Sequence, residues 1–365
     1  MSIALKATRA REVPHNRLTL GEAEVEAVTR TVRSGQWAQG PRVAELESDL
    51  ARIAGVKYCV CVASGLSALR LALGSLGVSA QHIVLVPAYS CVALANACLA
   101  WGARPVPVEV ESATWNLDSR SCRRAISDHA AKAIIAVNTF GAPVDLTFGD
   151  RSGVPVIEDC AHAFGRQIGQ QALGGRSDIG ILSFYATKLL GGGEGGAVLT
   201  NSARVFDFVK SARDYSDQPP DAYRMNDKMN DLEASLVLAQ LMRLPEMLER
   251  RRELAMRYME MLSASDANNN FFRLPRADDH QVWYRFAVEI LGDGAASTRD
   301  ELRGEGVDAA LPISDWRPND GPPCSNADRA YRSLLSLPLY PSLTEEEQDY
   351  VVDTFLSVCE EKSRA

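Results

Sequence analysis

The sequence lacks clusters of basic residues and long apolar runs. Its formal net charge is −8 at pH 7 and no basic run stands out, which disfavours general nucleic-acid binding. No stretch approaches the ~18 uninterrupted apolar residues of a membrane-spanning helix, and the N-terminal segment lacks the apolar region of a signal peptide. We therefore expect a cytoplasmic protein that has neither nucleic acid nor a membrane among its partners.

The sequence also lacks grouped metal ligands. Its eight cysteines include no C-x-x-C pair, and their spacing suits neither zinc nor a small disulfide scaffold, so we expect them to be reduced and mostly packed. The five histidines form no metal motif: His15, His82, His129, His162 and His280. No metal site is predicted.

Apolar residues, in contrast, are abundant and periodic. The 365 residues, 46% of them hydrophobic, suffice for a large buried core and two domains. Strand-like and helical patterns alternate along the first part of the chain, at 83–86, 92–101, 105–110 and 133–137. This alternation predicts an α/β fold with a doubly wound, largely parallel sheet.

A change of pattern near residue 245 predicts a second domain. Residues 244–262 read as a long charged amphipathic helix, and residues 282–290 alternate like a strand with one exposed face. We expect a large domain over residues 1–244, beginning with an irregular arm, and a smaller C-terminal α/β domain over residues 245–365. The last helix should start after Thr344, where Glu347 completes a T-x-x-E capping box.

The chain is organised around the stretch SFYATKLLGGGEGGAVLT at residues 183–200. Five glycines within six residues, 191–196, separate two strand-like runs and permit a tight turn with close backbone approach. A phosphate-binding P-loop would carry a lysine after its glycines, whereas Lys188 precedes them. Lys188 therefore lies where a strand ends, and ligands of open α/β sheets bind at the carboxyl ends of strands.

Lys188 is a candidate nucleophile for a carbonyl group. Burial or neighbouring cations lower the pKa of a lysine and make its amine reactive, and the commonest partner of such a lysine is pyridoxal phosphate (PLP). PLP requires a carboxylate for its ring nitrogen, a group stacked on its ring, and amides for its phosphate. On its own, Lys188 fits an ordinary solvated lysine better than a catalytic one.

Two upstream stretches supply these groups. In VPVIEDCAHAFG (154–165), a buried-strand pattern ends at Asp159, which is placed to hold a protonated ring nitrogen, and His162 follows where it could cover the ring or bond its hydroxyl. In CVCVASGLSALRLAL (59–73), a strand leads through a turn into a helix whose first amides, at Gly65 and Leu66, form an anion site. Each group alone has an ordinary structural explanation, but their combination indicates a cofactor site.

These stretches, together with VPAYSCVALANA, GARPVPVEVESATWNLD and MNDKMNDLEASLVLAQL, resemble the successive blocks of the PLP-dependent sugar aminotransferases of the DegT/DnrJ/StrS family. The resemblance covers about residues 35–262, with a weaker match at 334–347. It implies the aspartate-aminotransferase fold (fold type I) and a homodimer with shared active sites. It also implies that the cofactor is pyridoxal 5'-phosphate.

The resemblance assigns site residues by position. The family's lysine, aspartate and histidine or glutamine fall on Lys188, Asp159 and His162, and its phosphate-binding serine falls on Ser183. Asn226, with Lys228 beside it, matches the block that reaches the partner subunit's cofactor phosphate or substrate, and neither has an obvious local partner.

The chain departs from the family at two cofactor positions. Cys91 stands where the family commonly has an aromatic residue stacked on the cofactor, and the nearest aromatic is Tyr89, so Cys91, or Tyr89 with His162, would cover the ring. Leu66 stands where the family usually has threonine, so one hydroxyl to the phosphate is missing, and Ser67 could compensate.

The resemblance implies that Lys188 binds the cofactor covalently and then acts as general acid and base, while the amino group passes from glutamate to a nucleotide-linked keto-sugar. The alternatives are a cyclitol or unlinked keto-sugar acceptor, other PLP chemistry on an amino acid, and a non-catalytic regulator. The deoxygenating relatives carry histidine at the position of Lys188, which argues against their chemistry. Residues 306–316, GVDAALPISDW, differ from the histidine-tyrosine-proline segment of many relatives.

A nucleotide-linked substrate carries phosphate charges, which would require local basic residues in a protein of net charge −8. The candidates are four arginines, none within a recognised motif: Arg213, Arg224, Arg317 and Arg329.

Overall fold

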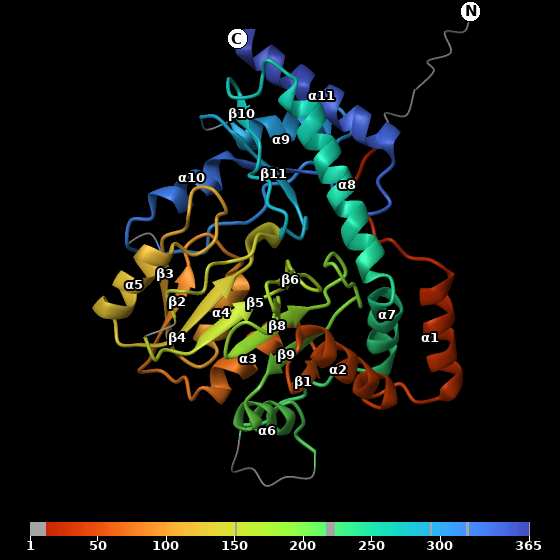
Figure 1. Ribbon diagram of the computed structural model, residues 1–365, viewed down its shortest axis with the longest axis vertical. Coiled ribbons are helices and arrows are strands. Elements are labelled where there is room, and N and C mark those ends of the chain that lie inside the picture. Colours follow the sequence, from red (N-terminus) through yellow and green to blue (C-terminus); the bar gives the residue numbers. More distant parts are fainter. Residues whose placement is uncertain (1–11, 150–151, 217–222, 293, 319–320, 365) are drawn as a thin grey trace, which may run out of the picture.

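The largest element of the computed structural model is a seven-stranded sheet (Figure 1). The structure describes residues 12–149, 152–216, 223–292, 294–318 and 321–364. The sheet contains β1 (Tyr58–Val62), β2 (Ile83–Pro87), β3 (Arg104–Val108), β4 (Ala131–Val137), β5 (Val156–Asp159), β8 (Ile179–Ser183) and β9 (Gly196–Thr200). Its strand order is β1-β9-β8-β5-β4-β2-β3, and within this sheet only β9 runs antiparallel to its neighbours. The predicted α/β, largely parallel sheet is confirmed.

Alternate residues of each strand face different hydrophobic layers, as the period of an extended chain requires. Val60 and Val62 of β1 pack into the layer under α3 (Gly65–Ser75), α4 (Val92–Leu99) and α6 (Ala203–Ala212). Cys59 and Cys61 face the opposite layer, under α2 (Pro41–Ala54) and α7 (Asp231–Leu241). The same opposite layer continues under α5 (Ser119–Asp128), which packs near β2 and β3. The sheet is thus covered on both faces, as a doubly wound fold requires.

The C-terminal region forms a second hydrophobic cluster around a three-stranded antiparallel sheet. Its elements are α8 (Leu244–Ser263), β10 (Phe272–Arg273), β11 (Phe286–Ile290), α9 (Ala295–Gly304), α10 (Ser325–Ser333), β12 (Leu334–Leu337) and α11 (Glu345–Arg364). The helix α8 runs from the large sheet toward α11 (Figure 1). Val13 belongs to this cluster and pairs with Val307, so the described end of the N-terminal arm packs on the C-terminal region. The domain boundary at 244/245 stays a prediction.

The remaining described elements are α1 (Glu22–Ser34), the short 3-10 helix η1 (Thr139–Gly141), β6 (Gln167–Ile168) and β7 (Gln171–Ala172). The predicted capping box at the start of α11 is confirmed, because the Thr344 hydroxyl accepts from the Glu347 amide while the Glu347 carboxylate accepts from the Thr344 amide. No helix of the described ranges is long and apolar enough to cross a membrane.

The segment 282–290 differs from the prediction of one long strand with an exposed face. Only Phe286–Ile290 is strand, and Trp283 is buried. The Val282 amide donates to the Gly141 carbonyl (2.8 Å), which ties this segment to η1 of the large sheet. Gly141 has φ of 95°, and a Cβ there would lie 1.4 Å from the Val282 oxygen, so the contact requires glycine. The prediction was wrong because a tertiary contact buries both faces of the segment.

Candidate active site

A cavity of about 240 Å³ lies at the carboxyl ends of β4, β5 and β8. Of the nine predicted site residues, Asn226 does not line this cavity. The other eight do: Gly65, Leu66, Tyr89, Cys91, Asp159, His162, Ser183 and Lys188. Sequence reasoning missed Thr139 and Tyr185 as lining residues. Their positions, just after β4 and just before Lys188, are strand-end positions of the kind that marked the other residues.

Asp159 ends β5 and is the buried carboxylate of this cavity. One of its oxygens, Oδ1, accepts a hydrogen bond from the Ala161 amide (2.8 Å). Burial raises the pKa of Asp159 to about 6 and the charge of Glu158 adds to the rise, against the opposing effects of the Ala161 amide and the Lys188 ammonium. A cationic group placed at Asp159 would favour its ionised form.

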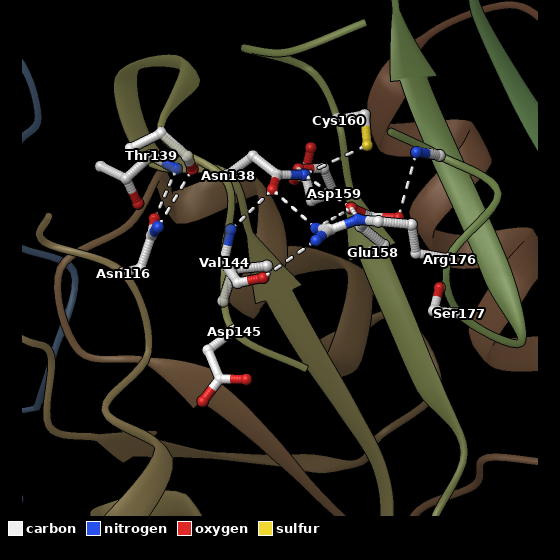
Figure 2. Close-up of polar contacts among 12 residues, drawn as sticks. Asn116, Asn138, Thr139, Val144, Asp145, Glu158, Asp159, Cys160, Arg176 and Ser177 are labelled. Atoms are coloured by element: carbon white, nitrogen blue, oxygen red, sulfur yellow. Dashed lines mark hydrogen bonds and ion pairs between the residues drawn. The ribbon is translucent and has the colours of Figure 1, made fainter. Parts of the chain in front are cut away.

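Glu158, the preceding residue, points to the other face of β5, into a cluster of polar groups (Figure 2). Its carboxylate pairs with the Arg176 guanidinium and accepts from the Gly174 amide (3.0 Å) and from Asn138 Nδ2 (3.1 Å). The Asn138 amide also donates to the Asp159 carbonyl (3.1 Å). This polar cluster, Asn138, Glu158 and Arg176, therefore supports the strand end that carries Asp159.

Lys188 follows β8 in a turn closed by its own amide, which donates to the Tyr185 carbonyl (2.8 Å). The glycine-rich turn after it contains Gly195 at φ of 128°, a conformation that side chains other than glycine's rarely allow. The Lys188 ammonium lies 5.1 Å from the centre of the Tyr284 ring. The predicted lysine therefore reaches the cavity from a turn that glycine makes possible.

His162 lies at the side of the cavity and makes ring contacts with two aromatic side chains. Its ring lies 4.4 Å from that of Tyr284 and 6.3 Å from that of Phe140, both nearly parallel to it. Its Nδ1 is buried and has no hydrogen-bond partner among the described residues. Burial, with the nearby Lys188 and Arg285 charges, lowers the pKa of His162 well below its usual value, so the ring is neutral and can accept or donate one hydrogen bond.

The start of α3 is the place where the sequence predicts an anion site. Ser64 caps the helix by accepting from the Ser67 amide (3.0 Å), and the amides of Gly65 and Leu66 belong to the first turn, which has no intrahelical acceptors. A Cβ on Gly65 would lie 2.8 Å from Ser183 Cβ, so glycine allows the Ser183 hydroxyl to approach the helix start.

Ser67 does not take the place of the missing threonine in this structure. Its buried hydroxyl donates to Asp227 Oδ1 (2.8 Å), and Ser67 does not line the cavity. Asp227 also pairs with Arg70, so Ser67 helps to join α3 to the loop before α7.

Tyr89 and Cys91, the two candidates for stacking on the cofactor, have different surroundings. The Tyr89 ring is completely buried against Trp115, Phe140 and Tyr331, and its hydroxyl has no partner within the described ranges. Cys91 is exposed at the start of α4. Because Tyr89 is already packed by three rings, Cys91 is the freer of the two to lie against a bound ring.

Asn226 lies on an exposed stretch of the loop between α6 and α7. The expectation that this loop has no local partner was wrong for Lys228, whose ammonium donates to Asp214 Oδ1 (2.6 Å) and whose backbone bridges to Val62. The bridge to Val62 places the loop beside β1, and Asn226 lies at the surface.

Three of the four candidate arginines are held by carboxylates of the same chain. Arg213 pairs with Glu47, Arg317 with Asp315 and Asp328, and Arg329 with Glu289. The fourth, Arg224, has no ion pair within the described ranges. The proposed basic residues for a nucleotide are thus mostly neutralised. Sequence reasoning also missed Tyr284 and Arg285. They come near Lys188 through the contact between η1 and the C-terminal region.

The cavity fits PLP on several grounds. Among the described residues, it combines a buried carboxylate with one oxygen that receives no hydrogen bond, at Asp159, a buried ring nitrogen without a partner at His162, and a helix start approached by Ser183. Lys188 adds the amine. These are the four kinds of group that the ring nitrogen, ring hydroxyl, phosphate and aldehyde of the cofactor require.

Comparison with known proteins identifies the family. The model of the DegT/DnrJ/EryC1/StrS aminotransferase family matches residues 18–356. The aminotransferase TlmJ from Streptoalloteichus hindustanus is 29% identical with a TM-score of 0.90, covering 96% of this chain and 100% of that one. The structure of S. venezuelae DesV is 28% identical with a TM-score of 0.87, covering 96% and 99%. NtdA from Bacillus subtilis, solved with the bound cofactor PMP, is 26% identical with a TM-score of 0.84, covering 93% and 82%. This chain therefore belongs to the DegT/DnrJ/EryC1/StrS aminotransferase family, and it is an enzyme whose cofactor is pyridoxal 5'-phosphate.

Proposed function

We propose that this enzyme transfers an amino group from an amino acid, glutamate by preference, to a keto-sugar in the synthesis of an amino sugar. The observation that carries the proposal is the meeting of Lys188, Asp159 and His162 in one cavity at the strand ends. The location in the cytoplasm expected from the sequence stays a prediction.

Asp159, His162 and the start of α3 hold the cofactor in this proposal. When bound, PLP takes up the electron pair released at the substrate carbon and carries the amino group between the two substrates. Asp159 keeps a proton on the ring nitrogen, and His162 bonds or covers the ring through its neutral imidazole. The amides of Gly65 and Leu66 and the Ser183 hydroxyl bind the phosphate.

Lys188 binds the cofactor and then serves as general base and general acid. With cofactor and substrate bound, the Lys188 amine would act as the base that takes the proton from the substrate carbon and as the acid that gives a proton back. The Tyr284 ring near its ammonium excludes water from this side of the amine.

A homodimer with shared sites forms part of the proposal. Exposed apolar side chains lie beside the cavity and on the Asn226 loop: Leu66 (40% exposed), Tyr185 (49%), Val92 (49%) and Met225 (48%). Burial of these side chains against a second copy would place Asn226 at the partner's phosphate site.

Mixed dimers test the shared site. If Asn226 acts in trans, mixing Lys188→Ala with Asn226→Asp subunits yields a dimer with one intact site, and roughly a quarter of wild-type activity returns under random pairing. Absence of any return after subunit exchange, or a monomer that retains PLP by light scattering, would contradict the shared site.

The acceptor is the least defined part of the proposal. Ile313, from the segment that differs from many relatives, lines the cavity, and Trp316 donates from its indole nitrogen to the Ser90 hydroxyl (3.2 Å). This segment is therefore placed to select the acceptor. The default is a nucleotide-linked keto-sugar, and the second candidate is a cyclitol or an unlinked keto-sugar, which needs no basic residues for phosphates.

A panel of acceptors distinguishes these candidates. The enzyme is first converted by glutamate to its pyridoxamine form, with loss of visible absorbance, and then mixed with nucleotide keto-sugars, scyllo-inosose or simple 2-keto acids. Return of the absorbance with a keto-sugar or the cyclitol supports the proposal. Return with 2-keto acids alone rejects the sugar function, and no response to any amino acid rejects aminotransfer altogether.

A further inference from the structure

Arg285 is a cation near the cofactor cavity, and the proposed reaction gives it no role. It precedes β11 and lines two small cavities, of about 50 and 60 Å³. The first adjoins the cofactor cavity through Thr139, which lines both. The second contains Thr187, the residue before Lys188, and Tyr284. Arg285 thus lies one layer of side chains away from the reacting amine.

Arg285 has no carboxylate partner within the described ranges. Its Nη1 lies 3.1 Å from His15 Nε2, its Cζ lies 5.4 Å from the centre of the Tyr284 ring, and its Nε is buried without a hydrogen-bond partner among the described residues. By contrast, Arg317 and Arg329 are each tied to acidic side chains. A guanidinium in this setting retains hydrogen-bond donors for an anionic ligand.

Its neighbours do not neutralise it. His15 Nε2 faces both Arg285 and the Ser336 hydroxyl (2.9 Å), so this nitrogen is an acceptor and the imidazole is uncharged. Burial and the Arg285 charge lower the pKa of His15 to about 4, which agrees with that assignment. Arg251, buried nearby, donates to the carbonyls of Trp283, Tyr284 and Leu339 and adds a second positive charge.

We propose that Arg285 binds the distal carboxylate of a dicarboxylic amino donor. The inference rests on the proposed aminotransferase function and names the class of its donor. The Lys188 ammonium and the Arg285 guanidinium lie 5.1 and 5.4 Å from the centre of the same Tyr284 ring, so one extended substrate can place its amine at Lys188 and its far end at Arg285. A planar guanidinium binds a carboxylate through two parallel hydrogen bonds.

The position of Arg285 favours the distal carboxylate over the α-carboxylate. Arg285 does not line the cofactor cavity, whereas Lys188 does. The α-carboxylate is attached to the reacting carbon and stays inside that cavity. The side-chain carboxylate is the group that extends beyond it.

The first test uses wild-type holoenzyme and three donors: glutamate, glutamine and norvaline. Bleaching of the cofactor absorbance is measured in single turnovers over a range of donor concentrations. Loss of a charge-assisted pair should weaken binding of glutamine and norvaline by about 10- to 100-fold relative to glutamate. Glutarate, which has no amine, should compete with glutamate, whereas butyrate should not. Equal binding of glutamate and glutamine would overturn the inference and the preference for glutamate, while leaving the proposed aminotransfer to a keto-sugar intact.

The second test uses Arg285→Gln, Arg285→Lys and the control Arg273→Gln, which removes a half-exposed arginine paired with Glu289 in the same region. Arg285→Gln should weaken binding of glutamate and glutarate by about 10- to 100-fold and leave glutamine nearly unchanged. Arg285→Lys should restore part of the preference for glutamate, and the control should match wild type.

Other outcomes would overturn the inference. Equal weakening of glutamate and glutamine in Arg285→Gln would assign Arg285 to the α-carboxylate or to structure. Weakening of a keto-acid acceptor with no effect on glutamate would move the carboxylate to the acceptor. If no amino acid bleaches wild type, the proposed function fails as well. If the variants do not fold, the comparison of the three donors and of glutarate competition in the wild-type enzyme still tests the inference.

Discussion

Glu158 and Asp159 are adjacent on β5, both are buried, and their surroundings differ completely. Glu158, in the polar cluster, is bonded by a guanidinium, a backbone amide and a side-chain amide. Asp159, in the cofactor cavity, receives one amide, and its pKa is raised to about 6 chiefly by burial. The alternation of a strand is enough to place one carboxylate in a polar cluster and its neighbour in the cavity.

The difference indicates that the side of β5 with Glu158 contributes to the stability of the fold and that the side with Asp159 is available to bind a ligand. A buried charge with all its partners contributes to folding only while the set is complete. A buried carboxylate with a single hydrogen-bond partner, such as Asp159, lowers stability when it is ionised without a ligand and is available to bind one. Substitutions in the polar cluster should therefore lower stability first, and substitutions in the cavity should lower activity first.

The largest effect should follow from Lys188→Ala in the cavity. Loss of the general acid and base should lower turnover by roughly 10³- to 10⁴-fold, and the visible absorbance of the lysine-bound cofactor should disappear. Because Lys188 has no ion pair within the described ranges, the unfolding free energy of the apoprotein should change little. Steady-state rates, absorbance spectra and urea unfolding measure these effects. Lys210→Ala, on the exposed side of α6, is the control, and wild-type turnover in Lys188→Ala would refute the assignment.

Arg176→Met should have the largest effect on stability. It leaves Glu158 buried without its cation, and breaking a buried pair in this way costs about 3–5 kcal/mol. Arg124→Met is a matched control, since the Arg124–Asp128 pair is exposed and should contribute about 0–1 kcal/mol. Denaturant unfolding of the apoproteins compares the two. Adding Glu158→Gln to Arg176→Met should recover part of the loss, and equal stability of the two single variants would break the distinction between the two sides.

Asp159→Asn should stabilise the apoprotein while weakening the holoenzyme. The folded protein holds the Asp159 proton up to about pH 6, whereas an unfolded carboxyl releases it near pH 4. Wild-type stability therefore falls as pH rises through this window, by up to about 3 kcal/mol. The variant should be more stable than wild type at pH 7.5 and similar to it at pH 4.

The measurement is thermal unfolding at both pH values with and without PLP. Added PLP should reverse the order at pH 7.5, because the ionised Asp159 gains a cationic partner. If the apo variant were less stable than wild type at pH 7.5, burial of the ionised Asp159 carboxylate would not destabilise the fold.

Much of the fold and of the candidate site could be predicted from local patterns. The alternation of strand-like and helical patterns predicted the doubly wound sheet, and strand-end positions predicted that Lys188, Asp159 and His162 lie near one another, as they do in one cavity. Local signals suffice there because the carboxyl ends of neighbouring parallel strands necessarily meet at one edge.

The remaining features depend on contacts between distant segments. Tyr284 and Arg285 come near Lys188 only because Val282 binds to Gly141 across the two regions, and no local pattern records that contact. The partners of Arg213 and Arg329 could not be predicted either, because an ion pair between distant residues has no signature in sequence spacing. Positive charge in a sequence is therefore a weak guide to free positive charge in the fold.

Leu66→Thr should produce the smallest effect. It adds a hydrogen-bond donor to the cavity that Asp159 faces. Leu66 lies in the first turn of α3, is 40% exposed and lines the cavity. A hydroxyl there can donate to the cofactor phosphate beside the helix amides, and a hydrogen bond to a charged group contributes about 1.5 kcal/mol at the lower end of its range, so the Kd for PLP should fall roughly tenfold.

Leu66→Val is the matched control for this substitution, because valine has the shape of threonine without the hydroxyl. The two variants also have similar helix propensities, so the difference between their Kd values isolates the hydrogen bond. Fluorescence titration of the apoproteins with PLP gives both values. Equal affinities would mean that the amides of α3 and the Ser183 hydroxyl already supply every hydrogen bond that the phosphate accepts. The cavity with its ligand bound would then resemble the polar cluster, in which each charged group has its partners.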